Sequence, residues 1–205
     1  MLFDFFKRKK NLSPEEFYAQ KNSAVEALLC TKIDTVYHAM LGYPVGGPLH
    51  IGISKNKSGG TYFTSDEVMS FEEELPMPNS RGRYELVMVT RLENGGDEVA
   101  AKMFDDRLLY CRKVMTMIGR YAKTAILEPH QTLELPIEVN ETHYYLLDVI
   151  DNEITQAKVG DEDFHLLCVI LITEAEFKYC KRYGAERLLF KLKKDGHHPF
   201  SDLNR

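Results

Sequence analysis

Four charged or titratable side chains stand where the sequence pattern predicts buried strands. Arg83 and Glu85 lie two residues apart among apolar neighbours, and His143 and His165 each open a further apolar stretch. A charge within an apolar strand needs a partner, because an unpaired buried charge is strongly destabilising. Arg83 and Glu85 face the same side of the expected strand, because strand side chains alternate. The pattern predicts either an internal ion pair or a recognition surface for a partner protein.

The two histidines raise a catalytic alternative. If the strands that they open are neighbours, His143 and His165 would meet near one sheet edge. A pairing with the thiol of Cys168 can be considered, because a nucleophile and its base need only spatial contact. Cys168 lies in the most apolar stretch of the chain, LLCVILI, where a thiolate is disfavoured. We therefore assign Arg83, Glu85, His143 and His165 as candidate partner-binding residues and assign no catalytic residue.

Metal and cofactor chemistry lacks its usual sequence patterns. The four cysteines form no C-x-x-C pair, and among the seven histidines only His197 and His198 are adjacent, with side chains that point apart. The fragment DEDFH, Asp161 to His165, lacks the ligand spacing of an EF-hand, and an acidic hairpin turn in solvent is the preferred interpretation. No nucleotide-binding, zinc-protease or serine-hydrolase motif is present. We expect no metal and no cofactor.

Composition favours one globular domain. The 205 residues are 44% hydrophobic and 28% charged, a balance that can bury a core without disulfides. A net charge of -5 disfavours nucleic acid as a partner. The longest apolar run, Leu166–Ile172, is far below the ~20 residues that span a bilayer. Widely spaced cysteines favour a reducing compartment, so we expect a cytoplasmic protein.

The N-terminus, MLFDFFKRKK, places four cations after a short apolar stretch. A signal peptide has the opposite order. Weak association of residues 1–10 with an anionic membrane surface is one interpretation, and a partly ordered lead-in that packs on the domain is the preferred one. We therefore divide the chain into a basic and aromatic segment, 1–12, and one domain, 13–205.

Four helices are expected. A capping box at Ser13 opens a helix that should run to about Leu29, and a second box at Thr173 opens another that stops at Gly184. A final amphipathic helix begins at Ala185. A long central helix carries apolar residues at helical spacing from Leu108 to Ala122, with Asp105 or Asp106 as its cap.

Strands are expected at 49–54, 61–65, within 79–92, and at 131–135, 143–150 and 164–172. In the third, Tyr84, Leu86 and Met88 face one way, and Val87 and Val89 face the other. Two apolar faces indicate a strand that is covered on both sides. The predicted fold class is α+β, a single domain with a mixed, mainly antiparallel β-sheet covered by amphipathic helices.

Six stretches in order resemble the Suppressor of fused domain family. They span roughly residues 34–205 and are GGPLHIGIS (46–54), GRYELVMVTRL (82–92), VMTMIGRYA (114–122), FHLLCVILITEAEF (164–177), YGAERLLFKL (183–192) and FSDLNR (200–205). The resemblance implies an α+β domain that binds proteins. The full-length animal member holds a Hedgehog-pathway transcription factor between two domains, and that partner is not carried over to this chain. Short members look bacterial and are proposed as immunity proteins against toxins.

Two classes of function follow. The first is a non-catalytic binding module of immunity or antitoxin type with one protein partner of unknown identity. The net negative charge would steer a basic partner toward the chain. The acidic segments FEEEL (71–75) and DED (161–163) are candidate contacts. The alternative is a motif-free enzyme or small-ligand-binding protein that uses His143, His165 and Glu85. If Glu85 is buried and paired, Glu85→Ala should destabilise the fold by about 1–3 kcal/mol. An unchanged melting temperature would favour the surface interpretation.

Overall fold

The structure is a computed structural model and describes residues 12–41, 43, 46–71, 76–93 and 95–202. Its strands are β1 (Thr35–Tyr37), β2 (Ile51–Lys55), β3 (Thr61–Ser65), β4 (Arg83–Thr90), β5 (Thr132–Glu138), β6 (Glu141–Val149), β7 (Ala157–Val159) and β8 (Glu162–Ile172). They form one eight-stranded sheet in the order β1-β2-β3-β4-β8-β6-β5, with β7 paired to β8. All pairs are antiparallel except β4 with β8. The prediction of a mixed, mainly antiparallel sheet in a single α+β domain is confirmed.

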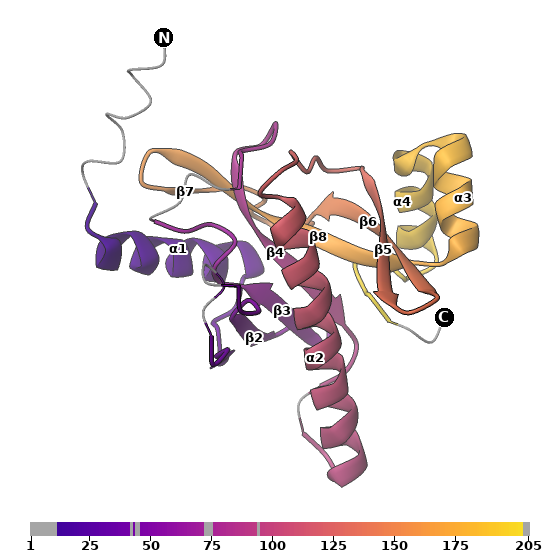
Figure 1. Cartoon of the computed structure of the whole chain (residues 1–205), viewed down its shortest axis with the longest axis horizontal. Coiled ribbons are helices and arrows are strands. Elements are labelled where there is room, and N and C mark those ends of the chain that lie inside the picture. The colour runs from indigo at the N-terminus through magenta and orange to yellow at the C-terminus, as the bar shows by residue number, and fades with distance from the viewer. Residues whose placement is uncertain (1–11, 42, 44–45, 72–75, 94, 203–205) are drawn as a thin grey trace.

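Helices cover both faces of this sheet (Figure 1). They are α1 (Pro14–Leu29), α2 (Glu98–Tyr121), α3 (Glu174–Tyr183) and α4 (Ala185–Lys194). The long helix α2 packs on one face, and its apolar stripe joins a first core cluster with residues of the central strands. Helices α1, α3 and α4 contribute to a second cluster on the opposite face. The sheet is thus the middle layer of three.

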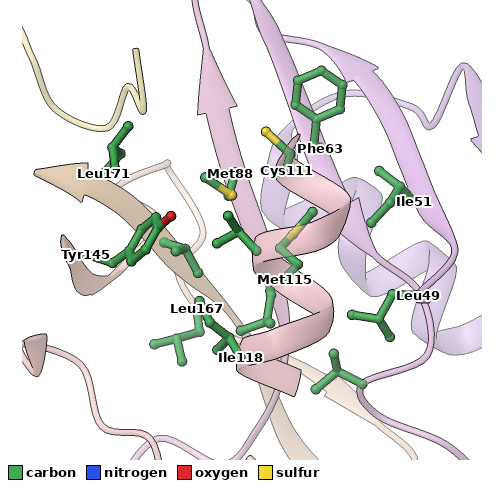
Figure 2. Packing of buried hydrophobic residues seen from close by; sticks show 14 of the residues in the cluster. Leu49, Ile51, Phe63, Met88, Cys111, Met115, Ile118, Tyr145, Leu167 and Leu171 are labelled. Atoms are coloured by element: carbon green, nitrogen blue, oxygen red, sulfur yellow. The ribbon is translucent and has the colours of Figure 1, made fainter. Parts of the chain in front are cut away.

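Strand β4 shows how the sequence pattern builds these layers. Tyr84, Leu86 and Met88 point into the α2 cluster, and Val87 and Val89 point into the opposite cluster. All five side chains are fully buried. Figure 2 shows the α2 side, where Met88 lies among side chains from the helix and from neighbouring strands. The expectation that this strand is covered on both sides is confirmed.

Both predicted capping boxes are present. The Ser13 hydroxyl accepts from the Glu16 amide at 3.2 Å, and the Glu16 carboxylate accepts from the Ser13 amide at 2.7 Å. Thr173 and Glu176 repeat the arrangement at the start of α3. These reciprocal bonds satisfy amides that a helix start leaves unpaired. Gly184, at φ +92°, ends α3 and leads directly into α4, as predicted.

Helix α2 begins earlier than predicted. Asp97 is its N-cap and accepts from the Ala100 amide at 2.9 Å, so the prediction of a cap at Asp105 or Asp106 is wrong. Both of these residues lie inside the helix and are exposed. The first turns of α2 extend past the sheet (Figure 1), so the apolar periodicity starts only at Phe104. The short strands β1 and β7 were not predicted, because three residues carry too little alternation to read.

Candidate functional site

The carboxylate of Glu85 is the centre of a buried polar cluster between β4, α1 and the segment after β3. Its Oε1 accepts from Lys21 Nζ at 3.1 Å and from the Met69 amide at 3.0 Å. Its Oε2 accepts from the Ser65 hydroxyl at 2.5 Å and from the Val68 amide at 3.2 Å. The side chains of Glu85 and Lys21 have no exposed surface. This ion pair therefore joins the first helix to the centre of the sheet.

Lys21 makes further hydrogen bonds and a second ion pair within the same cluster. Its Nζ donates to the Met69 carbonyl at 3.1 Å and to the Asp66 carbonyl, and it lies 3.3 Å from Asp66 Oδ1. Burial alone lowers the Lys21 pKa, but the carboxylates of Glu85 and Asp66 outweigh burial and raise it. Burial raises the pKa of Glu85, and the Lys21 charge opposes that shift. The cluster is a self-contained charge network.

Arg83 lies on the same side of β4 as Glu85 and has its own partner. Its Nε is 3.2 Å from Glu162 Oε2 on the neighbouring strand β8. Arg83 is 5% exposed, so little of its side chain is accessible to a partner at the surface. The interpretation of Arg83 and Glu85 as ion-paired strand residues is confirmed. Partner binding by either residue stays a prediction.

His165 is also fully buried, on β8 beside Tyr84 of β4. Its Nε2 lies 3.3 Å from the Asn79 amide nitrogen, and the same nitrogen donates to the Leu127 carbonyl at 2.9 Å. Burial, assisted by the nearby Arg81 charge, lowers the pKa of His165 to about 4. The imidazole is therefore neutral at pH 7 and holds the loop at Asn79 against the strand.

His143 belongs to a separate chain of hydrogen bonds between β6 and α2. Its Nε2 lies 2.5 Å from Glu141 Oε1, and its Nδ1 lies 2.7 Å from the Tyr110 hydroxyl. That hydroxyl is also 2.7 Å from the hydroxyl of the fully buried Tyr145. Burial raises the pKa of Tyr110 to about 12 and raises that of Tyr145. Both phenols stay protonated at neutral pH, so the chain acts as a clamp rather than as an activated nucleophile.

The expectation that His143 and His165 meet is wrong. Strands β6 and β8 are neighbours, but they run antiparallel, with Tyr144 opposite Ile172. The starts of the two strands therefore lie at opposite ends of the pairing. Cys168 is fully buried, and burial raises its pKa, in agreement with a structural cysteine.

Lys21 is the residue that sequence reasoning missed. A signal was present, because Lys21 lies four residues after Phe17 and three or four before Ala24 and Val25. These apolar residues form the buried face of α1, so the lysine stands in an apolar stripe. A buried cation in α1 and a buried anion in β4 could have been paired from sequence.

Two hollows mark the described surface. A shallow groove of about 410 Å³ lies on the α3–α4 pair and is lined by Tyr179, Glu186, Arg187, Phe190, Lys191 and Lys194. A cleft of about 250 Å³ lies between α1 and strands β1 to β3 and includes Asp66 and the buried Thr64. No group of three histidine, cysteine or carboxylate side chains that could hold a metal is found within the described ranges. None of the described helices has the length and hydropathy to cross a membrane.

The acidic segments predicted as contacts are only partly described. The tip of the β7–β8 hairpin carries Asp161 to Asp163, and Asp163 lies 3.6 Å from Lys158 with both side chains exposed, as expected for an acidic hairpin turn in solvent. Residues 72–75 of FEEEL and the N-terminal residues 1–11 lie outside the described residues.

The protein is an α+β domain. Its mixed sheet has one parallel pair of strands, β4 and β8, at the centre, and helices cover both faces. The family profile of Suppressor of fused protein (SUFU) matches residues 58–205. The chain belongs to this family. A solved structure described as "the Sufu-Fu complex crystal structure" is similar, with TM-score 0.63 and 13% identity over 88% of this chain and 85% of that chain. A comparison with curated proteins finds no match.

Proposed function

We propose that this chain is a non-catalytic protein-binding module. The observation that carries the proposal is the fold, which over 88% of the chain is similar to the structure described as "the Sufu-Fu complex crystal structure". Membership of the SUFU family supports the same class. The buried charges fit this role, because Glu85 and Lys21 satisfy each other inside the domain. They build a rigid support and leave recognition to the exposed surface.

The finer proposal is an immunity or antitoxin-type protein that neutralises a toxin domain in the cytoplasm. It rests on the short-member resemblance and predicts a single tight partner without turnover. Such a protein should bind the folded toxin at a one-to-one ratio, because neutralisation by capture requires a stable complex.

The experiment is a tagged pull-down from the native host with quantitative mass spectrometry, repeated with toxin-producing neighbours present. Any enriched protein is then purified and titrated calorimetrically, and one saturable site supports the binding module. Co-expression of that partner with this chain tests neutralisation, with restored growth as the expected result. A partner that binds but is not neutralised leaves the binding module standing and removes the immunity role. Absence of any saturable partner contradicts the binding module itself.

One observation favours the alternative of a small-ligand-binding protein. Thr64, a residue 2% exposed, lines the 250 Å³ cleft beside Asp66, and its buried hydroxyl has no hydrogen-bond partner among the described residues. A ligand whose hydrogen-bonding group reaches this hydroxyl through the cleft would satisfy it. A thermal-shift screen tests this alternative, with Thr64→Val as the matched control. A ligand that raises the melting temperature of the natural sequence but not that of the variant would support it.

A further inference from the structure

The α3–α4 helix pair carries a charge opposite to that of the rest of the protein. The pair, residues 174–194, contains seven lysines and arginines and three acids, Glu174, Glu176 and Glu186, which gives it a formal charge of +4. Because the whole chain carries -5, the remaining residues carry -9. Figure 1 shows the two helices side by side at one end of the sheet, apart from α1 and α2. The helix pair therefore carries a net positive charge, whereas the rest of the chain is net negative.

Three of these cations form a line along α4. Arg187, Lys191 and Lys194 are exposed and follow the i, i+4, i+7 spacing of one helix face. Lys178 and Lys193, in contrast, are paired with Glu174 and Asp151, each at 2.6 Å. No described carboxylate lies within ion-pair distance of the three aligned cations. They form a basic line about 10 Å long, as the rise of a helix over seven residues requires.

Aromatic rings border this basic line. Phe190 is 73% exposed, and Tyr179 of α3 lies across the groove of about 410 Å³. Lys191 Nζ is 5.8 Å from the centre of the Tyr179 ring. An exposed phenylalanine between cations offers an apolar contact at the place where a carboxylate would be attracted. Glu186 also lines the groove and is the single acid among its six lining residues.

We propose that this groove, lined by Arg187, Phe190, Lys191, Lys194 and Tyr179, is the docking site for an acidic segment of the partner protein. The inference rests on the proposed function, because it assigns a surface and a partner chemistry to the binding module. The segment carries two or three carboxylates over about 10 Å, to meet the basic line, and one bulky apolar side chain, to cover Phe190. Charge complementarity selects this occupant.

A short segment fits better than nucleic acid or a membrane. Either of those extends far beyond a 10 Å line and would face the acidic remainder of the protein, which repels it. A peptide meets only the charges within about one Debye length of the groove, where the cations dominate.

The test uses a fluorescein-labelled helical peptide of about 14 residues with glutamates at i, i+4 and i+7 around one leucine. Its binding to the full chain is followed by fluorescence anisotropy, and the same peptide with glutamine at each glutamate is the ligand control. The triple variant Arg187→Glu, Lys191→Glu, Lys194→Glu should weaken binding at least tenfold, and Phe190→Ala should weaken it about threefold or more. If the triple variant does not fold, the corresponding triple glutamine variant replaces it.

A matched variant separates the local effect from total charge. Lys55, Lys57 and Lys102 are exposed, and none has an ion pair with a described residue; their replacement by glutamate changes the net charge by the same amount. This control should bind the acidic peptide within about twofold of the natural sequence. An equal loss in both triple variants would overturn the inference, because only the global field would then matter. Absence of peptide binding would also overturn it.

Two further experiments compare other negatively charged ligands with the peptide and test whether the groove binds the partner protein. Binding of phosphatidylserine vesicles or duplex DNA in preference to the peptide would overturn the acidic-segment inference. In the pull-down, a partner that is captured by the natural sequence and lost with the Arg187, Lys191 and Lys194 variant supports it. A partner retained by that variant contradicts this docking site and leaves the binding module intact. No partner for either protein contradicts the proposed function, while the peptide titration still decides the groove.

Discussion

Replacing Glu85 by alanine removes the centre of the buried cluster and leaves several groups behind. Lys21 stays inside the domain with a full charge and keeps only Asp66, 33% exposed, as a counter-charge. The amides of Val68 and Met69 lose their acceptor. Each of these groups was taken out of water on folding, so none is rehydrated without opening the structure.

The size of the effect follows from these losses. Removing one partner of a buried ion pair costs about 3–5 kcal/mol, since the other charge stays buried. Lys21 still donates to two backbone carbonyls, which places the expected loss near the lower end, at about 3 kcal/mol. For a chain of this size, the melting temperature should fall by roughly 6–12 °C. This loss is at the upper end of the range that the sequence alone predicts, because the partner of Glu85 is itself buried.

Thermal unfolding followed by circular dichroism, together with urea titration, measures this loss. The double variant Lys21→Met with Glu85→Leu is the control, because it removes both charges. It should lose much less than the sum of the two single variants, as found for buried pairs replaced by apolar residues. A fall of less than about 2 °C for Glu85→Ala would refute the reasoning. Additive losses in the double variant would show that the two charges do not stabilise each other.

Three further predictions concern other buried contacts. The His165 pKa of about 4 lies below its ordinary value, so the unfolded chain takes up a proton first. This group should therefore lower the free energy of unfolding by about 1.4 kcal/mol for each pH unit between about pH 6.5 and pH 4. Urea titrations at several pH values should show that the free energy of unfolding of His165→Gln depends less steeply on pH. Gly82→Ala would place a methyl group 2.3 Å from a backbone oxygen at φ +108°, and should lower the free energy of unfolding by more than roughly 2 kcal/mol in thermal unfolding. Its control is Gly196→Ala, at φ +72° with nothing within 4 Å, which should lower it by about 1 kcal/mol. Tyr110→Phe leaves the Tyr145 hydroxyl without a described partner and should cost about 1–3 kcal/mol in urea unfolding, and a loss below about 0.3 kcal/mol would contradict the clamp.

Much of the fold could be read from local signals. The two capping boxes at Ser13 and Thr173 and the double-sided pattern of β4 depend on neighbouring residues, so sequence predicts them well. The start of α2 at Glu98 was missed, because its first turns project into solvent and carry no apolar stripe. The parallel pairing of β4 with β8 joins residues some eighty positions apart, and no local pattern encodes it.

The same limit applies to the candidate site. Arg83 and Glu85 were visible as charges in an apolar strand, and their need for a counter-charge follows from electrostatics. The partners themselves, Lys21 of α1 for Glu85 and Glu162 of β8 for Arg83, depend on packing, although Lys21 within an apolar stripe gave a clue. The separation of His143 from His165 depends on the direction of β6 relative to β8, which their sequences do not specify.

The Glu85–Lys21 pair also shows which part of the chain forms the folding unit. The SUFU profile begins at residue 58 and therefore excludes α1, β1 and β2. Yet Lys21 of α1 neutralises Glu85 inside the matched region, and α1 supplies Phe17 and Leu28 to the same core as β8. Without α1, the strand that carries the family likeness would hold an unpaired buried carboxylate. The first helix is therefore part of the same structural unit as the matched strands, although the family profile does not reach it.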